Sequence, residues 1–381
     1  MKNLETLIQD LCPDGVEFVK LGECCTFKRG TTITAKNAIA GDVPVLAGGQ
    51  KPAYYHNVSN RAGETIVVAG SGAYAGYVSY WTIPVFLSDS FSVQPDNRLV
   101  VKFVYYFLKN IQQKIFATKK GSGVPHVHGS SIAKFEIPLP PIEVQTEIVR
   151  ILDKFTSLEA ELEAELDCRK RQYEYYRDRL LSFENVGGQE VTISKIGDIG
   201  RICMCKRIMK NQTNSESGIP FYKIGTFGKV ADAYISNDVY EEYKKLYSYP
   251  KKGDILMSAS GTIGRTVVFN GEPSYFQDSN IVWVDNDETK VFNSYLNYYY
   301  QIIEWKTQGG TIKRLYNNLL AGATIKYPSL EEQHRIVSIL DRFESLTTSL
   351  QSGLPAEIAA RRQQYEHYRD KLLTFKRKGA A

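Results

Sequence analysis

Residues that could catalyse group transfer occur in this chain only within incomplete motifs. Adenine methyl transfer needs a Gly-rich cofactor loop and an Asn/Asp-Pro-Pro-aromatic motif, and residues 139–142 (LPPI) lack both the polar and the aromatic member. A phosphate-binding loop needs the pattern G-x-x-x-x-G-K-S/T. Residues 70–76 (GSGAYAG) supply glycines without the lysine. Neither chemistry therefore has its full set of residues.

Metal-dependent chemistry has equally little support. His126 and His128 are metal-ligand types, but no carboxylate or third histidine accompanies them in the sequence. Asp14, Glu17 and Lys20 are the residue types of a nuclease site, but Glu17 and Lys20 are three positions apart rather than two. We therefore expect no catalytic residue, no metal and no cofactor on this chain.

The cysteines also lack the spacing of a zinc site. No C-x-x-C pair occurs, and no histidine cluster accompanies Cys24-Cys25 or Cys203-x-Cys205. We expect reduced, buried thiols. The six residues concerned are Cys12, Cys24, Cys25, Cys168, Cys203 and Cys205.

Composition indicates a folded chain with room for two domains. The 381 residues are 43% hydrophobic and 23% charged, as in ordinary globular proteins. The net charge of +5 is too small to identify a nucleic-acid-binding protein by itself. No apolar run approaches the roughly 20 residues of a membrane helix, and the N-terminus lacks a signal-peptide pattern. We therefore expect a cytoplasmic protein without membrane contact.

A repeat is the main internal signal. Residues 145–158 (QTEIVRILDKFTSL) and 333–346 (QHRIVSILDRFESL) are identical at nine of 14 positions. Residues 172–183 (QYEYYRDRLLSF) and 364–375 (QYEHYRDKLLTF) are identical at nine of 12. The segments before these blocks match only at scattered positions, which include Ser71-Gly72 with Ser260-Gly261, Asp89-Ser90 with Asp278-Ser279, Gly121 with Gly309 and His126 with Arg314.

The repeated blocks have the periodicity of long helices. Their apolar residues recur at steps of three, four and seven, which predicts a coiled-coil-like seam. We expect Ser329 and Glu332 to form a capping box, and Gly353 and Pro355 to kink or break the second helix. The seam pairs the two helices or, alternatively, forms a homodimer. Residues assigned to helix pairing or partner docking are Ile148, Leu152, Phe155, Leu162, Tyr173, Tyr176, Ile336, Leu340, Phe343, Tyr365 and Tyr368.

These features predict an α+β fold with a pseudo-two-fold internal repeat. Two α/β domains, residues 1–141 and 185–328, alternate with long helices at residues 142–184 and 329–381. About 40 residues at roughly 1.5 Å each make a rod of about 60 Å. Because each helix must lead back towards its own domain, we expect the two helices to be antiparallel.

Several segments carry a resemblance to a known family. They are the paired I-L-D-x-F blocks, the tandem EAELEAEL at residues 159–166, the paired Q-Y-E-x-Y-R-D-x-L-L blocks, GLPAE at residues 353–357 and PKKGDILMSASGTIG at residues 250–264. Over nearly its whole length the chain resembles the DNA-specificity subunits of type I restriction–modification enzymes.

The resemblance implies a non-catalytic reader of double-stranded DNA. Residues 1–141 and 185–328 would be target-recognition domains, each binding one half of a bipartite site. The helices would set the gap and dock two modification (methyltransferase) subunits, and restriction subunits with motor and nuclease activity would join them. S-adenosylmethionine, ATP and Mg²⁺ would bind to those partners. One EAEL unit adds about 6 Å of helix, nearly two base-pair steps of roughly 3.4 Å.

Candidate DNA contacts follow from the chemistry of readout. Bases are read by side-chain donors and acceptors, and phosphates by basic, hydroxyl or backbone N–H groups. The Gly-plus-basic loops at residues 119–126 and 309–314 fit this best. Candidates in the first domain are Lys28, Arg29, Lys51, Arg61, Ser71, Tyr74, Lys119, Lys120, Ser122 and His126. Candidates in the second are Lys206, Arg207, Lys210, Lys223, Ser260, Thr262, Arg265, Lys313, Arg314 and Tyr316.

A helical adaptor with two protein-binding heads is the alternative from another functional class. Sequence-selective DNA binding that weakens steeply with salt favours the specificity subunit. Salt-insensitive binding to a protein, without a response to DNA, favours the adaptor.

Overall fold

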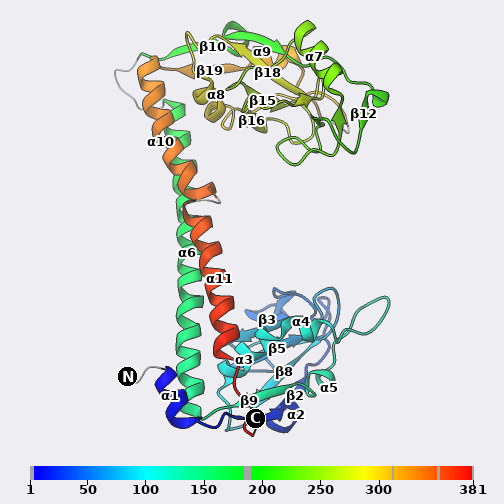
Figure 1. Ribbon diagram of the computed structural model, residues 1–381, viewed down its shortest axis with the longest axis vertical. Helices are drawn as coiled ribbons and strands as arrows, with labels where there is room; N and C mark the ends of the chain where they lie inside the picture. Colours follow the sequence, from blue (N-terminus) through cyan, green and yellow to red (C-terminus); the bar gives the residue numbers. More distant parts are fainter. Residues whose placement is uncertain (1–3, 184–189, 311–312, 350–351, 380–381) are drawn as a thin grey trace. The chain divides into compact units, whose positions relative to one another are not determined.

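The computed structural model of the chain describes residues 4–183, 190–310, 313–349 and 352–379 (Figure 1). The chain divides into two compact units, Met1–Glu163 with Glu357–Ala381, and Ala164–Ala356. Helix α6 (Ile142–Ser182) contributes residues to both units. The units are described one at a time below.

An antiparallel sheet forms the centre of the first unit, in the order β2-β8-β5-β6. Its strands are β2 (Cys25–Arg29), β5 (Thr65–Ala69), β6 (Val78–Trp81) and β8 (Ser90–Pro95). Strand β5 reads TIVVA and is buried along its whole length, as is common for β-branched central strands. Two smaller sheets are β4-β3-β7 and β1-β9. Their strands are β1 (Glu17–Lys20), β3 (Val43–Leu46), β4 (Tyr54–His56), β7 (Phe86–Leu87) and β9 (Glu136–Leu139).

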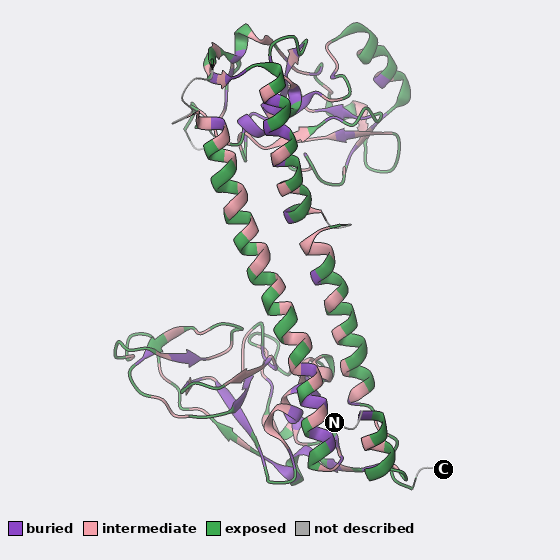
Figure 2. Ribbon diagram, turned by 90° about the vertical axis from the view of Figure 1, so that its left-hand side faces the viewer, coloured by how far each residue is buried: buried purple, intermediate pink, exposed green. Residues whose placement is uncertain are grey.

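Helices cover the central sheet of this unit and complete its core. Short helices are α1 (Leu4–Leu11), α2 (Leu21–Cys24), α3 (Val101–Asn110), α4 (Gln112–Phe116) and α5 (Gly129–Ile132). Phe103 and Leu108 of α3 belong to one hydrophobic cluster with Ile66 of β5 and with Ile148 and Leu152 of α6. In this unit the buried residues of α6 lie near its N-terminus (Figure 2).

The second unit repeats the strand order of the first. Its central sheet, β11-β18-β15-β16, corresponds to β2-β8-β5-β6, and β10-β19 corresponds to β1-β9. In the remaining sheet, β12-β14-β13-β17, strand β13 pairs with β17 in parallel, as β3 does with β7. The strands are β10 (Thr192–Lys195), β11 (Gly200–Cys203), β12 (Thr213–Asn214), β13 (Ile219–Tyr222), β14 (Tyr234–Ile235), β15 (Ile255–Ser258), β16 (Thr266–Val268), β17 (Tyr275–Phe276), β18 (Ile281–Asn286) and β19 (Thr324–Tyr327).

Helices of the second unit pack on this framework in the same way. They are α7 (Asn237–Leu246), α8 (Asn293–Tyr299), α9 (Asn317–Gly322) and α10 (Leu330–Thr348), with 3-10 turns at Ile196–Asp198 and Lys210–Gln212. Tyr295 and Tyr298 of α8 are buried in a cluster with Ile336 and Leu340 of α10. The predicted mixed α/β composition with a framework shared by two regions is confirmed.

Each unit contains an antiparallel pair of helical segments. In the first, α11 (Leu354–Leu372) lies against α6, where Arg362 contacts Glu159 and the Tyr368 ring stacks on Phe155 at 5.4 Å. In the second, α10 lies against α6, and the Tyr176 ring stacks on Phe343 at 5.7 Å. The two stacked pairs correspond in the sequence repeat.

The second helical segment differs from one continuous helix. It consists of α10 and α11, and the expected break is at Gly353, whose φ is +99°. A Cβ there would lie 2.7 Å from the Ser345 carbonyl oxygen, so the turn requires glycine. The prediction of helix up to residue 381 is wrong beyond Leu372. Residues 376–378 instead hydrogen-bond with Val16, which donates to the Lys376 carbonyl at 2.9 Å.

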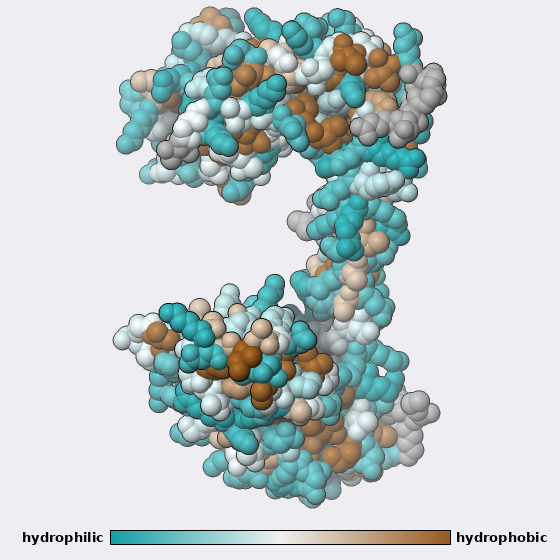
Figure 3. All heavy atoms as spheres, turned by 180° about the vertical axis from the view of Figure 1, so that it is seen from behind, coloured by the Kyte–Doolittle hydropathy of each residue, from teal (hydrophilic) through white to brown (hydrophobic). Residues whose placement is uncertain are grey.

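Surface properties add two findings. Five of the cysteines are buried as predicted, but Cys168 is exposed because it lies on the solvent side of α6. The face shown in Figure 3 is mainly hydrophilic on both units, with separate apolar patches. Within the described residues, no helix combines the length and apolarity needed to cross a membrane.

Candidate nucleic-acid interface

Two loops meet at the end of β5 in the first unit. The hairpin at residues 119–126 is closed by hydrogen bonds from Lys120 N to His126 O (2.9 Å) and from His126 N to Lys120 O (2.8 Å). It is joined to the loop after β5, because Val127 N donates to Gly70 O at 2.9 Å and Ser71 forms a bridge with His126. The fold thus brings the predicted residues of both loops together.

Asp89 connects these loops to the sheet. It precedes β8, and its carboxylate accepts a hydrogen bond from Ser71 Oγ. Its other oxygen lies 3.5 Å from Arg29 Nη2 at the end of β2. The Arg29 side chain is 70% exposed, so most of its donors still face solvent.

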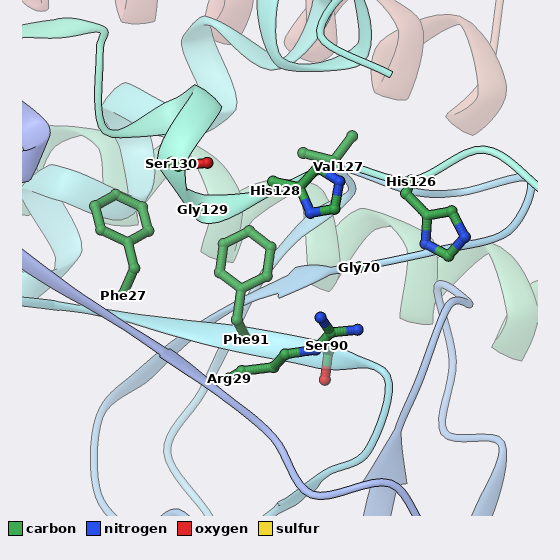
Figure 4. A pocket seen from close by; sticks show the side chains of 10 residues that line it. All are labelled: Phe27, Arg29, Gly70, Ser90, Phe91, His126, Val127, His128, Gly129 and Ser130. Carbon is green, nitrogen blue, oxygen red and sulfur yellow. The ribbon is translucent and has the colours of Figure 1, made fainter. Parts of the chain in front are cut away.

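A cavity of about 190 Å³ lies beside this cluster. Arg29 lines it from β2, and His126 and His128 line it from the loop before α5 (Figure 4). The two histidine rings stack with their centres 6.4 Å apart. Phe27 and Phe91 supply an apolar wall. The cavity therefore offers hydrogen-bond donors and aromatic surface in one place.

The second unit has the same arrangement with different side chains. Gln308 N donates to Arg314 O (3.0 Å) and Arg314 N to Gln308 O (2.8 Å), which closes the corresponding hairpin. Ser260 forms a bridge with Arg314, as Ser71 does with His126. Asn280 takes the place of Asp89, since its Oδ1 accepts from Ser260 Oγ at 2.8 Å.

This geometry corrects one sequence match. Asp89 was aligned with Asp278, but Asp89 precedes Ser90, which pairs with Ala69, and Asn280 precedes Ile281, which pairs with Ser258. The match was two residues off because the register depends on strand pairing, which the sequence letters alone do not reveal.

Comparison with known proteins agrees with this duplicated architecture. The family described as "Type I restriction modification DNA specificity domain" matches residues 13–167 and again residues 188–360. The chain belongs to this family.

Relatives of the specificity family match along almost the entire chain. A putative type I restriction enzyme specificity subunit of Haemophilus influenzae is 44% identical over 391 residues, covering 98% of this chain and 100% of the relative. The EcoR124I/EcoR124II specificity subunit of Escherichia coli is 28% identical over 424 residues, covering 98% and 97%. The crystal structure of a type I restriction–modification S subunit from M. genitalium has a TM-score of 0.58 at 16% identity, covering 94% of this chain and 96% of that one. These similarities support DNA sequence specificity as the role of the chain.

The other predicted contacts of this specificity subunit differ in accessibility. In the first unit Lys28, Lys51, Tyr74, Lys120 and Ser122 are exposed. Lys119 is half-buried and donates to Ala73 O at 3.1 Å.

Arg61 is engaged inside the first unit. It donates to Ser92 Oγ at 2.8 Å and to Lys28 O at 3.0 Å. Burial lowers the pKa of Arg61. These contacts hold β2 against its neighbours and leave Arg61 few donors for DNA.

The second unit shows the same mixture. Arg207, Lys210, Thr262, Lys313 and Tyr316 are exposed. Ser260 is buried, and Arg265 donates to Ile224 O at 3.2 Å and lies over the Phe227 ring. Lys223 pairs with Asp232 at 2.8 Å, and Lys206 lies over the Tyr247 ring.

The seam residues of the repeated blocks divide between core and surface. Ile148, Leu152, Ile336 and Leu340 are buried in the two unit cores. Leu162 is half-buried. The aromatic residues behave in pairs or contact their own unit: Phe155 with Tyr368, Tyr176 with Phe343, Tyr365 in the first core cluster, and Tyr173 donating to Gln301 at 3.0 Å.

Sequence reasoning missed two buried glutamines that anchor the helices. Gln145 has no exposed surface; its Oε1 accepts from Val100 N (2.8 Å), and its Nε2 donates to Arg98 O and Pro140 O. Gln333 makes the equivalent three hydrogen bonds in the second unit. The available signal was that both are the first identical letter of a repeated block.

The aspartates of the I-L-D-x-F blocks form a second anchor. Tyr106 Oη donates to Asp153 Oδ1 at 2.5 Å, and Tyr298 Oη donates to Asp341 Oδ1 at 2.5 Å. Burial, reinforced by the neighbouring carboxylates, raises the pKa of both tyrosines. Each repeated block is therefore fixed to the domain of its own unit by matching contacts.

Proposed function

We propose that this chain reads a bipartite double-stranded DNA site, with one half-site bound by each unit. One observation carries the proposal. The two units share strand order, hairpin and Ser–Asp/Asn contact, while the side chains presented there differ. A constant framework with different donors suits two ligands of one chemical class and different sequence.

The proposed division of the chain follows its repeat. Residues 1–141 and 185–328 are the target-recognition domains. Residues 142–184 and 329–381 supply the helices, which form an antiparallel coiled-coil-like spacer with pseudo-two-fold symmetry. The within-unit pairing of α6 with α11 and of α6 with α10 supports this arrangement.

Two matching apolar patches support docking of two copies of one partner. Leu158 and Tyr368 of the first unit are 45% and 42% exposed, and Leu346 and Tyr176 of the second are 37% and 40% exposed. They occupy equivalent positions of the repeat, each around a stacked aromatic pair. Identical patches fit two modification subunits better than two unrelated proteins.

Catalysis in the proposed assembly belongs to the partners. The modification subunits would bind S-adenosylmethionine and transfer the methyl group. The restriction subunits would use ATP and Mg²⁺ for motor and nuclease activity. The assembly would act in the cytoplasm, and this chain would supply sequence specificity and assembly contacts without catalysis of its own.

Methylome sequencing tests the proposal directly. The chain is expressed with its modification subunit in a host that lacks such systems, and the modification subunit alone is the control. We expect a new methylated motif made of two half-sites and a gap, seen only when both chains are present. Soluble, assembled subunits that produce no motif would refute the proposal and favour the helical adaptor with two protein-binding heads.

A further inference from the structure

One polar side chain beneath each hairpin links it to the central sheet, and only its chemistry differs between units. Asn280 immediately precedes β18 and Asp89 immediately precedes β8. Each accepts a hydrogen bond from the serine of the neighbouring loop, Ser260 or Ser71. Neither residue was a candidate from the sequence. Their position beneath the hairpins makes them suited to orient a side chain that reads a base.

In the second unit the oriented side chain is Arg314. Asn280 Oδ1 accepts from Arg314 Nη2 at 3.2 Å as well as from Ser260 Oγ at 2.8 Å. Arginine has only donors, so this contact fixes which end of the amide faces the guanidinium. Within the described residues Asn280 Nδ2 donates to no other group, and Arg314 keeps further N–H donors. Asn280 is neutral, so Arg314 also keeps its full positive charge.

In the first unit the cation comes from a different element. Arg29 of β2 approaches Asp89, while the hairpin position equivalent to Arg314 is His126. The register of β11 with β18 places Met204 at the position that Arg29 has beside β8. An arginine therefore converges on the same framework position in both units, from the strand in one and from the hairpin in the other.

We propose that Asp89 and Asn280 are positioning residues for base readout, and that Arg314, held by Asn280, reads a guanine in one half-site. This inference rests on the proposed function. The planar fork of arginine matches the O6 and N7 acceptors of guanine in the major groove. Fixing one edge of the guanidinium lowers the entropy lost when the other edge binds the base. The surrounding framework then keeps the fork in one orientation.

The test measures base preference, using the complex with its modification subunits. Competition binding is measured on duplexes that carry the wild-type motif with one base pair changed at a time. Arg314→Lys keeps the charge and removes the fork, so preference for one G·C pair should fall roughly 10- to 100-fold. Asn280→Ala should lower the same preference about fivefold, the weight of one hydrogen bond. Preference within the other half-site should not change.

Two further variants separate positioning from stability. Asn280→Asp retains the acceptor for Ser260 and Arg314, so it should keep the guanine preference that Asn280→Ala loses. Asp89→Asn should affect only the half-site of the first unit. A purely structural role would lower binding to all duplexes equally and leave the ratios unchanged. Arg314→Lys keeps the test decisive if Asn280→Ala fails to fold.

The outcomes distinguish this inference from the proposed function. A wild-type bipartite motif with base ratios unaltered in Arg314→Lys and Asn280→Ala would overturn the inference and leave the function standing. A wild-type complex without sequence preference would overturn both.

Discussion

At the scale of single residues, the hairpin at residues 119–126 combines two kinds of DNA contact. His126 is held in the framework by the bridge to Ser71, whereas Lys120 is exposed. A fixed side chain suits base readout, and an exposed ammonium group suits a phosphate. The two residues should therefore fail differently when they are replaced.

Lys120→Ala should weaken binding of the assembled complex to all DNA sequences by a similar factor. Loss of one phosphate contact releases one counterion fewer, so the slope of log K against log salt should become shallower by about 0.9. Titrations at several salt concentrations measure this slope. Lys20→Ala, at the exposed end of β1, is the matched control and should leave the slope unchanged. A change in base preference would contradict the phosphate assignment of Lys120.

Gln145 is a residue on which the first unit depends for stability. Gln145→Ala leaves Val100 N and two carbonyl oxygens, of Arg98 and Pro140, without this partner in a buried place. Unpaired buried polar groups cost about 1–3 kcal/mol each, and partial relaxation limits the total loss of unfolding free energy to about 2–4 kcal/mol. Denaturant unfolding measures it.

The neighbouring exposed Thr146 provides the control for Gln145. Thr146→Ala should change the free energy of unfolding by less than about 0.5 kcal/mol. Gln333→Ala should match Gln145→Ala, because its three hydrogen bonds are equivalent. Equal, small effects of all three substitutions would show that the glutamines are not anchors.

At the scale of elements, the helices carry two functions on different faces. One face of each repeated block is buried in its own unit through residues such as Ile148 and Ile336. The exposed patches around Tyr368 and Tyr176 lie outside those cores. Helical periodicity explains why a single block can anchor a domain and still offer a partner surface.

Leu158→Glu should remove one docked modification subunit and leave the other in place. A charge placed in one patch opposes burial there, while the equivalent patch around Leu346 is untouched. Native mass spectrometry should show one modification subunit per chain for Leu158→Glu and none for Leu158→Glu with Leu346→Glu. The exposed Leu246, on α7, is the control, and Leu246→Glu should keep two. Full occupancy in the double variant would refute docking at these patches.

Helices were the elements most predictable from sequence, for a physical reason. A periodic apolar seam and local signals such as Pro140-Pro141 and Gly353 are contained in short windows. The helix does start at Ile142, and the break is at Gly353. The tail after Leu372 was missed because its conformation depends on hydrogen bonds to Val16, which is remote in sequence.

The candidate site was only partly predictable for the same reason. Glycines beside basic residues indicated both hairpins. Asp89 and Asn280 were missed because a polar residue before a strand acquires its role from distant partners. Asn280, for example, is 34 positions from Arg314. Its neighbour Ser279 has a φ of +53°, a turn that the aligned letters did not reveal.

At the scale of the whole molecule, the tandem EAELEAEL lies in the helix that supplies residues to both units. Arg362 of α11 contacts Glu159 and Glu163, the first residues of the two tandem units. Deleting residues 159–162 would bring Glu163 and Asp167 into the same four-residue spacing. A carboxylate pair for Arg362 is therefore retained after the deletion, and the helix pairing should survive a change in length.

We expect that deletion to alter the gap of the bipartite motif while both half-sites stay the same. It removes about 6 Å of helix, which allows a change of one or two base pairs at roughly 3.4 Å each. Methylome sequencing of the deletion variant measures the gap directly. Arg362→Ala is the control: it removes the ion pairs at full helix length, which are partly exposed and contribute less than about 1 kcal/mol, so the gap should not change. Unaltered half-sites separated by an unaltered gap in the deletion variant would show that α6 does not set the spacing.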